Sequence, residues 1–225
     1  MGRDIVLDTP SGAIGAWRAD PIAAPRGGIV VVQEIYGVNA HVRSVVDRYA
    51  AEGYVALAPA FFDASPGAGH GIELGYTRGD TSRGKALVDH LGLDAAVAIV
   101  DAAATQLRGE GIKVGVVGFC WGGTVALLAN TRLGLPAVSY YGARNLPYVD
   151  EPLRAPMQFH FGEDDPSIPA EAIEAHRERK PDADVFSYPG AGHAFNRDSD
   201  GTHYHAEAAR LAHQRTMRLF TGALG

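Results

Sequence analysis

The chain has 225 residues, of which 46% are hydrophobic, and this supports a substantial core; we expect residues 1–225 to form a single domain. The formal net charge of −6 comes from mixed acidic and basic residues, without the basic stripe typical of nucleic-acid-binding proteins. Apolar runs of membrane length and an N-terminal signal peptide are both missing, and one cysteine cannot form an internal disulfide, so we expect a cytoplasmic protein.

The N-terminal half alternates strand-like and helix-like segments. Two alternating runs, Asp4–Asp8 and Ala13–Arg18, are joined by a turn sequence and predict a hairpin. The continuous apolar run Gly28–Gln33 is typical of a strand buried on both faces in a parallel sheet. The segments expected next are a helix over Asn39–Glu52, a strand over Tyr54–Ala58, a Gly- and Pro-rich stretch over Phe61–Gly79, and a helical stretch over Ser82–Leu107 with a break near Gly92.

The C-terminal half continues this alternation. The expected segments are strands over Lys113–Val117, Pro136–Tyr140, Pro156–Phe161 and Val185–Tyr188, and helices from Trp121, over Ala170–Arg179 and over Tyr204–Phe220. The pattern predicts an α/β fold with a mostly parallel central sheet, helices on both of its faces and no large cap domain. Functional sites in such sheets lie beyond the carboxyl ends of the strands.

The only cysteine lies in the most informative motif of the chain. Cys120 is the central residue of Gly118-Phe-Cys-Trp-Gly122, between an apolar strand and a helix-like run. This is the nucleophile-elbow pattern, with sulfur in place of the usual serine oxygen. Gly118 and Gly122 flank the nucleophile because a Cβ atom at either position would crowd the turn. The positive end of the following helix favours thiolate over thiol, which predicts a nucleophile rather than an inert buried cysteine.

A thiol nucleophile needs a base, and the base needs an acid that orients it. Asp165 follows one predicted strand, and His193 lies on a Gly-rich loop after the next. The order nucleophile, acid, histidine is the one found on this kind of sheet. We prefer Asp165 to Glu163 and Asp164 because it directly precedes the Pro-Ser-Ile-Pro turn into the next helix. The alternative for Asp165 is a helix N-cap.

Five ordered sequence blocks between about residues 28 and 220 resemble the dienelactone hydrolase family. They are Gln33–Asn39, Gly118–Gly123, Tyr140–Gly142, Phe161–Asp165 and Gly192–Phe195. The resemblance implies an α/β-hydrolase fold and a triad of Cys120, Asp165 and His193. It also implies hydrolysis of small enol lactones or esters through a thioester, with a carboxylate-bearing dienelactone converted to maleylacetate and with no cofactor.

The resemblance also assigns residues around the nucleophile. The glutamate that matches Glu34 contacts the cysteine in the family, protects the resting thiol and takes part in forming the thiolate. A carboxylate at the end of a buried strand needs a partner, and a buried cation is the alternative partner for Glu34. The oxyanion hole is expected at the backbone N–H groups of Ile35 and Trp121, with packing as the other role of the Trp121 side chain.

Substrate binding in the family uses two arginines, whose planar fork suits a carboxylate. Arg197, shortly after the histidine, matches one of them. Arg83 is the better match for the other if Asp101 matches the acid of the family's helix, and Arg78 stays an alternative. The alternative role of Arg83 and Arg78 is a solvated charge, and that of Arg197 is a surface ion pair. Tyr141 is expected to line the pocket, with a core role as the alternative. Ala194 stands where the best-known members have serine beside the histidine.

Two other functions remain open. One is a general short-chain carboxylesterase or lactonase that acts on neutral esters without Arg197. The other is a protein that binds a ligand or senses oxidants through its cysteine without turnover, although a sensor needs no ordered acid and histidine. The pair His203 and His205 lacks a third metal ligand at suitable spacing, and we expect it to form an exposed polar face. We therefore expect a monomer that binds a small lactone or ester, with no metal, nucleic-acid or membrane partner.

Overall fold

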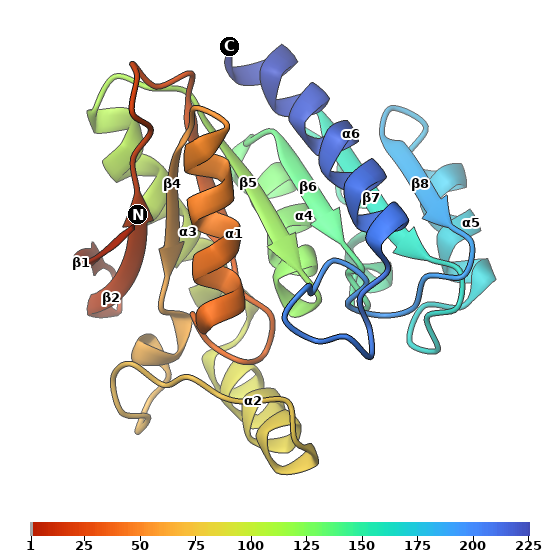
Figure 1. The fold of residues 1–225 in the computed structure, drawn as a ribbon, viewed down its shortest axis with the longest axis horizontal. Coiled ribbons are helices and arrows are strands. Elements are labelled where there is room, and N and C mark those ends of the chain that lie inside the picture. Colours follow the sequence, from red (N-terminus) through yellow and green to blue (C-terminus); the bar gives the residue numbers. More distant parts are fainter. Residues whose placement is uncertain (1) are drawn as a thin grey trace. The chain divides into compact units, whose positions relative to one another are not determined.

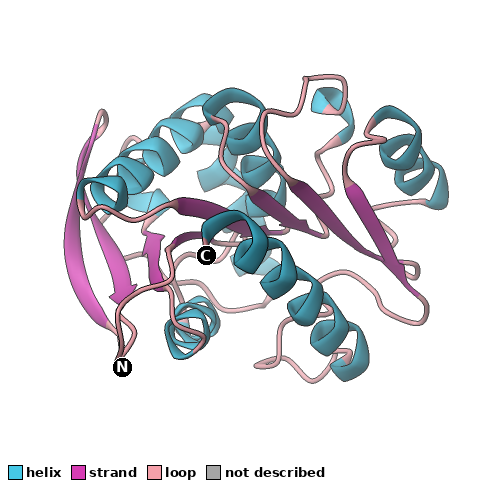
Figure 2. Cartoon of the chain, turned by 90° about the horizontal axis from the view of Figure 1, so that it is seen from above, coloured by secondary structure: helices cyan, strands magenta, loops and turns pink. Residues whose placement is uncertain are grey.

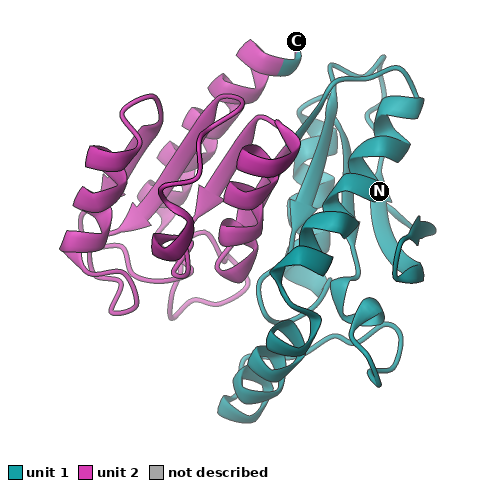
Figure 3. Ribbon diagram, turned by 180° about the vertical axis from the view of Figure 1, so that it is seen from behind, with its two compact units in different colours: residues 1–115, 224 teal, residues 116–223, 225 magenta. Residues whose placement is uncertain are grey.

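The computed structural model describes residues 2–225 and shows strands and helices alternating along the chain (Figure 1). Backbone contacts divide these residues into two compact units, which are coloured separately in Figure 3. The first extends to Gly115 and includes Leu224, and the second covers Val116–Ala223 and includes Gly225. Each unit is described by itself below.

The first unit contains four strands and three α-helices. They are β1 (Arg3–Thr9), β2 (Gly12–Ala19), β3 (Gly28–Val32), α1 (Ala40–Ala51), β4 (Val55–Pro59), α2 (Arg78–Leu91) and α3 (Leu93–Gly109), with a 3-10 turn at Phe61–Ala64. The strand order is β1-β2-β4-β3, in which only β3 and β4 pair in parallel. The expected hairpin is confirmed, with Thr9 paired to Gly12. Helices α1 and α3 cover opposite faces of these strands (Figures 1 and 2).

Local capping decides where α2 begins and ends. The helix begins at Arg78, four residues before the expected Ser82, because Thr77 and Asp80 form a capping box in which the Thr77 hydroxyl accepts from the Asp80 N–H at 3.1 Å. The expected break at Gly92 is confirmed: its φ of 77° is a conformation that glycine adopts at little cost, and it separates α2 from α3. Arg78 and Arg83 consequently lie on the same helix.

The second unit begins within β5 (Val114–Phe119). Its other elements are α4 (Trp121–Leu133), β6 (Ala137–Tyr140), β7 (Met157–Gly162), α5 (Ala170–Arg179), β8 (Asp184–Tyr188) and α6 (Ala206–Leu224), with a 3-10 turn at Leu146–Tyr148. The order is β5-β6-β7-β8, and all three pairings are parallel. Helix α6 covers one face, and α4 and α5 cover the other (Figures 1 and 2). Helix α6 begins at Ala206 because His205 caps it: the Nδ1 atom of His205 accepts a hydrogen bond from the Ala208 N–H at 3.2 Å.

A buried polar network joins the elements of the second unit. His160 on β7 is fully buried, with Nδ1 2.8 Å from the Tyr188 hydroxyl and Nε2 3.2 Å from the Thr216 hydroxyl of α6. Tyr140 on β6 shares a 2.7 Å hydrogen bond with the same threonine. Burial holds the pKa of His160 well below 6.5, so the ring is neutral at pH 7. The network therefore fixes the strands whose carboxyl ends carry the candidate site.

The loops that connect the helices and strands are too short to contain an additional folded domain. The two longest, residues 65–77 and 189–205, contain turns and bends but no helix or strand. No cap domain is therefore inserted in the part of the chain that the structure describes. Over the same residues, no helix combines the length and the apolar character needed to cross a membrane.

Candidate active site

Cys120 lies at the sharp turn between β5 and α4, as the motif predicts. Its backbone N–H donates to the Tyr140 carbonyl at 3.0 Å, and its carbonyl accepts from the Gly123 N–H at 2.9 Å. Its φ of 56° is uncommon for a residue with a side chain and costs on the order of 1–3 kcal/mol. The side chain is partly exposed. The strained turn thus presents the sulfur at the carboxyl end of β5.

Glycines allow this turn to close. A Cβ atom on Gly118 would lie 1.8 Å from the Gly122 carbonyl oxygen, which is backbone and cannot rotate away. A Cβ atom on Gly123 would lie 2.7 Å from the Tyr140 carbonyl oxygen. The crowding expected at Gly118 is therefore confirmed, and Gly123 is a second position where α4 passes too close to the sheet for a side chain.

We expect Gly118→Ala to lower the free energy of unfolding by about 3 kcal/mol or more, because the new methyl group overlaps a backbone oxygen. Urea unfolding measures the change. Gly109→Ala is the matched control, since a Cβ atom there meets nothing within 4 Å and the residue ends α3. That control should be neutral or slightly stabilising, and equal losses in both variants would contradict the explanation.

The loops after β7 and β8 are bound together. The Asp164 N–H donates to the Ala191 carbonyl at 2.9 Å, and Gly162 lacks the Cβ atom that would lie 2.2 Å from the same oxygen. This close approach places His193 Nδ1 2.6 Å from Asp165 Oδ2. The Asp165 side chain is fully buried, and its other oxygen accepts from the Ser167 N–H at 2.8 Å. The acid is thereby fixed in the orientation that holds the imidazole.

Of the three neighbouring acids, Asp165 is the one that meets His193. Glu163 is exposed and accepts a 2.7 Å hydrogen bond from the Ser187 hydroxyl, and Asp164 is exposed. The N-cap of α5 is Pro169, so Asp165 does not cap that helix. The sequence preference for Asp165 agrees with this geometry.

His193 also interacts with the side chain of Cys120. Burial lowers the pKa of His193, but the charge of Cys120 and the hydrogen bonds to Asp165 and Cys120 outweigh burial and raise this pKa well above 6.5. The imidazole can therefore hold a proton at pH 7. His193 thus interacts with both Asp165 and Cys120 within the second unit.

Backbone strain concentrates around this series. Among residues 2–225, the non-glycine residues with positive φ are Cys120, Tyr141 and Ala194. Tyr141 is fully buried, and its ring centroid lies 5.1 Å from that of His193, while Ala194 directly follows His193. Strained conformations of this kind cluster at functional sites. Trp121, 3% exposed, is the first residue of α4, so its N–H lies at the helix N-terminus.

Arg197 lies in the loop after His193 but not on the surface. Its side chain is 5% exposed, and its Nη2 lies 3.2 Å from Asp200 Oδ2. The ion pair that is the alternative to substrate binding is therefore present, and in it Arg197 is buried while Asp200 is partly exposed. Asp200 was not singled out from the sequence, because an acid three residues further along an irregular loop carries no periodic signal.

The remaining predicted residues belong to the first unit. Glu34 is 2% exposed just beyond the end of β3, so the expected buried carboxylate is present. Ile35 follows it and is also buried; a Cβ atom on Gly84 would lie 1.9 Å from its carbonyl oxygen, which shows how closely α2 packs here. Arg78 and Arg83 are both exposed on α2.

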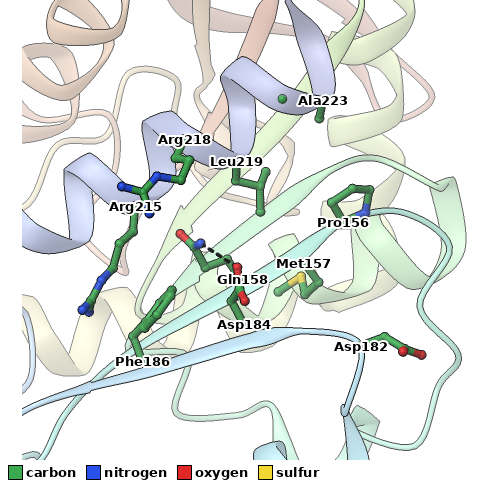
Figure 4. A pocket seen from close by; sticks show the side chains of 11 residues that line it. Pro156, Met157, Gln158, Asp182, Asp184, Phe186, Arg215, Arg218, Leu219 and Ala223 are labelled. Atoms are coloured by element: carbon green, nitrogen blue, oxygen red, sulfur yellow. Dashed lines mark hydrogen bonds between the residues drawn. The ribbon is translucent and has the colours of Figure 1, made fainter.

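A cavity of about 340 Å³ in the second unit lies away from the candidate site (Figure 4). Its walls come from the beginnings of β7 and β8 and from the last turns of α6, whereas Asp165 and His193 follow the opposite ends of those strands. Two contacts join side chains that line it: the Arg215 guanidinium lies 4.0 Å from the Phe186 ring centroid, and Gln158 donates to Asp184 at 3.4 Å. The cavity is therefore not the reaction site.

The two histidines near the start of α6 have structural partners. His203 Nδ1 lies 2.6 Å from Asp200 Oδ2, and His205 caps the helix. Over the described residues, no group of three or more His, Cys, Asp or Glu side chains is placed to hold a metal ion.

The parallel strands, the nucleophile turn and the loops beyond the strand ends define an α/β-hydrolase. The family model of the dienelactone hydrolase family matches residues 14–224, and the chain belongs to this family. A carboxymethylenebutenolidase of Pseudomonas putida is 34% identical over 213 residues, covering 90% of this chain and 89% of the relative. A Synechocystis protein provisionally named carboxymethylenebutenolidase is 35% identical over 230 residues, covering 92% and 91%.

A solved structure agrees with these sequence relatives. A Klebsiella pneumoniae protein, provisionally named a dienelactone hydrolase, has 29% identity and a TM-score of 0.84, with 98% of each chain covered. Family and relatives together show that the chain is a hydrolase of ester or lactone bonds.

Proposed function

We propose that the chain uses Cys120 to hydrolyse small enol lactones and esters, and that a carboxylate-bearing dienelactone, converted with water to maleylacetate, is its preferred substrate. The observation that carries the proposal is the 2.6 Å contact between His193 and Asp165, together with the interaction of His193 with Cys120 at the sharp turn after β5. The family and the Pseudomonas putida relative support the substrate class.

In the first step, the sulfur of Cys120 attacks the acyl carbon of the substrate. The backbone N–H of Trp121 donates to the developing oxyanion from the N-terminus of α4. The acyl C–O bond then breaks, His193 gives its proton to the departing enol oxygen, and a thioester remains. An enol leaves easily, so a thiolate of modest basicity is sufficient.

In the second step, water hydrolyses the thioester. His193 takes a proton from the water as its oxygen attacks the thioester carbon, and the C–S bond breaks to give the acid and the resting sulfur. Asp165 holds the imidazole in one tautomer and stabilises its protonated form through the 2.6 Å contact. Tyr141 would form the wall beside the imidazole.

Roles for Glu34, Ile35 and Arg83 are part of the same proposal and are supported by the sequence resemblance. Glu34 would protect the resting thiol, Ile35 would supply the second oxyanion donor, and Arg83 would bind the substrate carboxylate together with Arg197.

A general carboxylesterase is the second candidate, and the Arg197–Asp200 ion pair favours it. A guanidinium whose charge is already compensated attracts a substrate carboxylate less strongly. Neutral acyl groups would then enter as readily as charged ones.

Steady-state hydrolysis of dienelactone and of p-nitrophenyl acetate separates the two candidates. We expect Arg197→Ala to lower kcat/KM for dienelactone relative to p-nitrophenyl acetate by about 10- to 100-fold, because a charge-assisted hydrogen bond to the carboxylate is lost. Arg78→Ala and Arg83→Ala, which change exposed arginines on one helix, show which of the two adds to the effect. If wild type prefers the neutral ester and Arg197→Ala leaves the ratio unchanged, the dienelactone assignment is wrong and the general esterase stands.

A further inference from the structure

Three titratable side chains in the loop after His193 form what we call the 197–203 cluster: Arg197, Asp200 and His203. Asp200 Oδ2 lies 3.2 Å from Arg197 Nη2 and 2.6 Å from His203 Nδ1, so the arginine and the histidine contact the same carboxylate oxygen. The Asp200 N–H also donates to the Arg197 carbonyl at 3.2 Å. Side-chain exposure rises outward through the cluster, from 5% at Arg197 to 16% at Asp200 and 47% at His203.

Asp200 is held firmly in its charged form. Its second oxygen accepts from the Thr202 N–H at 3.0 Å. Burial raises the pKa of Asp200, but the hydrogen bonds from His203 and Thr202 and the charge of Arg197 outweigh it and lower the pKa below its ordinary value. Since an arginine is always protonated in proteins, the buried Arg197 and the partly exposed Asp200 form a pair with no net charge.

The pairing of Arg197 with Asp200 bears on substrate binding because Arg197 lies only four residues after His193 in the sequence. The Arg197 N–H donates to the Ala194 carbonyl at 2.9 Å, so residues 194–197 form a tight turn that begins at the residue after His193. A carboxylate that approaches Arg197 therefore also meets the negative charge of Asp200. At such short separations inside a protein, the repulsion offsets much of the attraction.

We propose that Asp200 is a specificity-determining residue that offsets the charge of Arg197 and so lowers the preference of the site for anionic substrates, widening its range to neutral esters. This inference rests on the proposed function, in which Cys120 is the nucleophile and Arg197 binds the substrate carboxylate.

Alkylation of Cys120 by iodoacetate and by iodoacetamide tests the inference without relying on any one substrate. Both reagents react by the same displacement of iodide by sulfur, and they differ by one negative charge. We expect Asp200→Asn, which keeps the shape of the side chain, to raise the iodoacetate-to-iodoacetamide rate ratio about tenfold. A merely structural defect would change both rates alike and leave the ratio unchanged.

Asp198→Asn is the matched control, because it removes the same charge from an exposed position in the same loop. It should leave the ratio within about twofold, since exposed charges are screened.

His203→Arg provides a second variant in case Asp200→Asn fails to fold. It brings a permanent positive charge to the outer side of Asp200 and keeps the Arg197–Asp200 pair intact. We expect a ratio about threefold above wild type. The inference is overturned if the folded variants show an unchanged or lower ratio while iodoacetamide still labels Cys120 quickly in wild type, which leaves the proposed function standing. If wild-type Cys120 reacts with neither reagent, the proposed function fails and the inference fails with it.

Discussion

Replacement of Cys120 by alanine is expected to lower ester turnover by about 10⁴-fold or more, because without the sulfur no thioester can form. Alanine also has a Cβ atom, so the strain at φ 56° is the same in both proteins and the fold should keep its thermal stability. Initial rates with p-nitrophenyl acetate, measured together with the melting temperature, check both halves of this expectation.

Because the chain has a single thiol, any label that iodoacetamide places on a thiol reports on Cys120 alone. Iodoacetamide should label wild type with one group per chain and remove the initial burst of p-nitrophenol, since the sequence has one cysteine. Cys120→Ala should take up no label. Turnover within tenfold of wild type in Cys120→Ala would show that another group carries the reaction.

The second large effect is expected at Asp165. Asp165→Asn should lower kcat by about 10³- to 10⁴-fold, because the amide cannot accept the His193 N–H as a carboxylate does and favours the wrong tautomer. Removing this negative charge also takes away one of the interactions that raise the pKa of His193. The alkaline limb of the pH–rate profile should therefore move to lower pH.

Two neighbouring acids provide matched controls for Asp165. Asp164→Asn removes the same charge from the adjacent exposed residue, and Glu163→Gln alters a side chain that bonds Ser187 instead of His193. Both should keep kcat within about threefold and leave the pH profile in place. A loss at Asp164 equal to that at Asp165 would mean that loop charge, not the hydrogen bond to His193, supports the reaction.

Elements with strong local signals could be predicted from the sequence. The buried strand β3 follows from five apolar residues in a row, and the turn at Cys120 follows from the glycines around it, since both depend on neighbours in the chain. The beginning of α2 was expected four residues late. Its Thr77–Asp80 capping box is a local signal too, but it lies within a Gly- and Pro-rich stretch that favours a loop.

The sequence by itself determined the sharp turn at Cys120, the order of Cys120, Asp165 and His193 after their strands, and the alternation of strands and helices, because each depends on residues close together in the chain. Only the tertiary structure decided that Asp165 faces His193 while Glu163 bonds Ser187, since this depends on the approach of the 162–165 loop to Ala191. It also decided that Arg197 is buried against Asp200. The physical reason is that the partner of a loop charge is set by how the backbone turns in space, which no periodicity or short motif encodes.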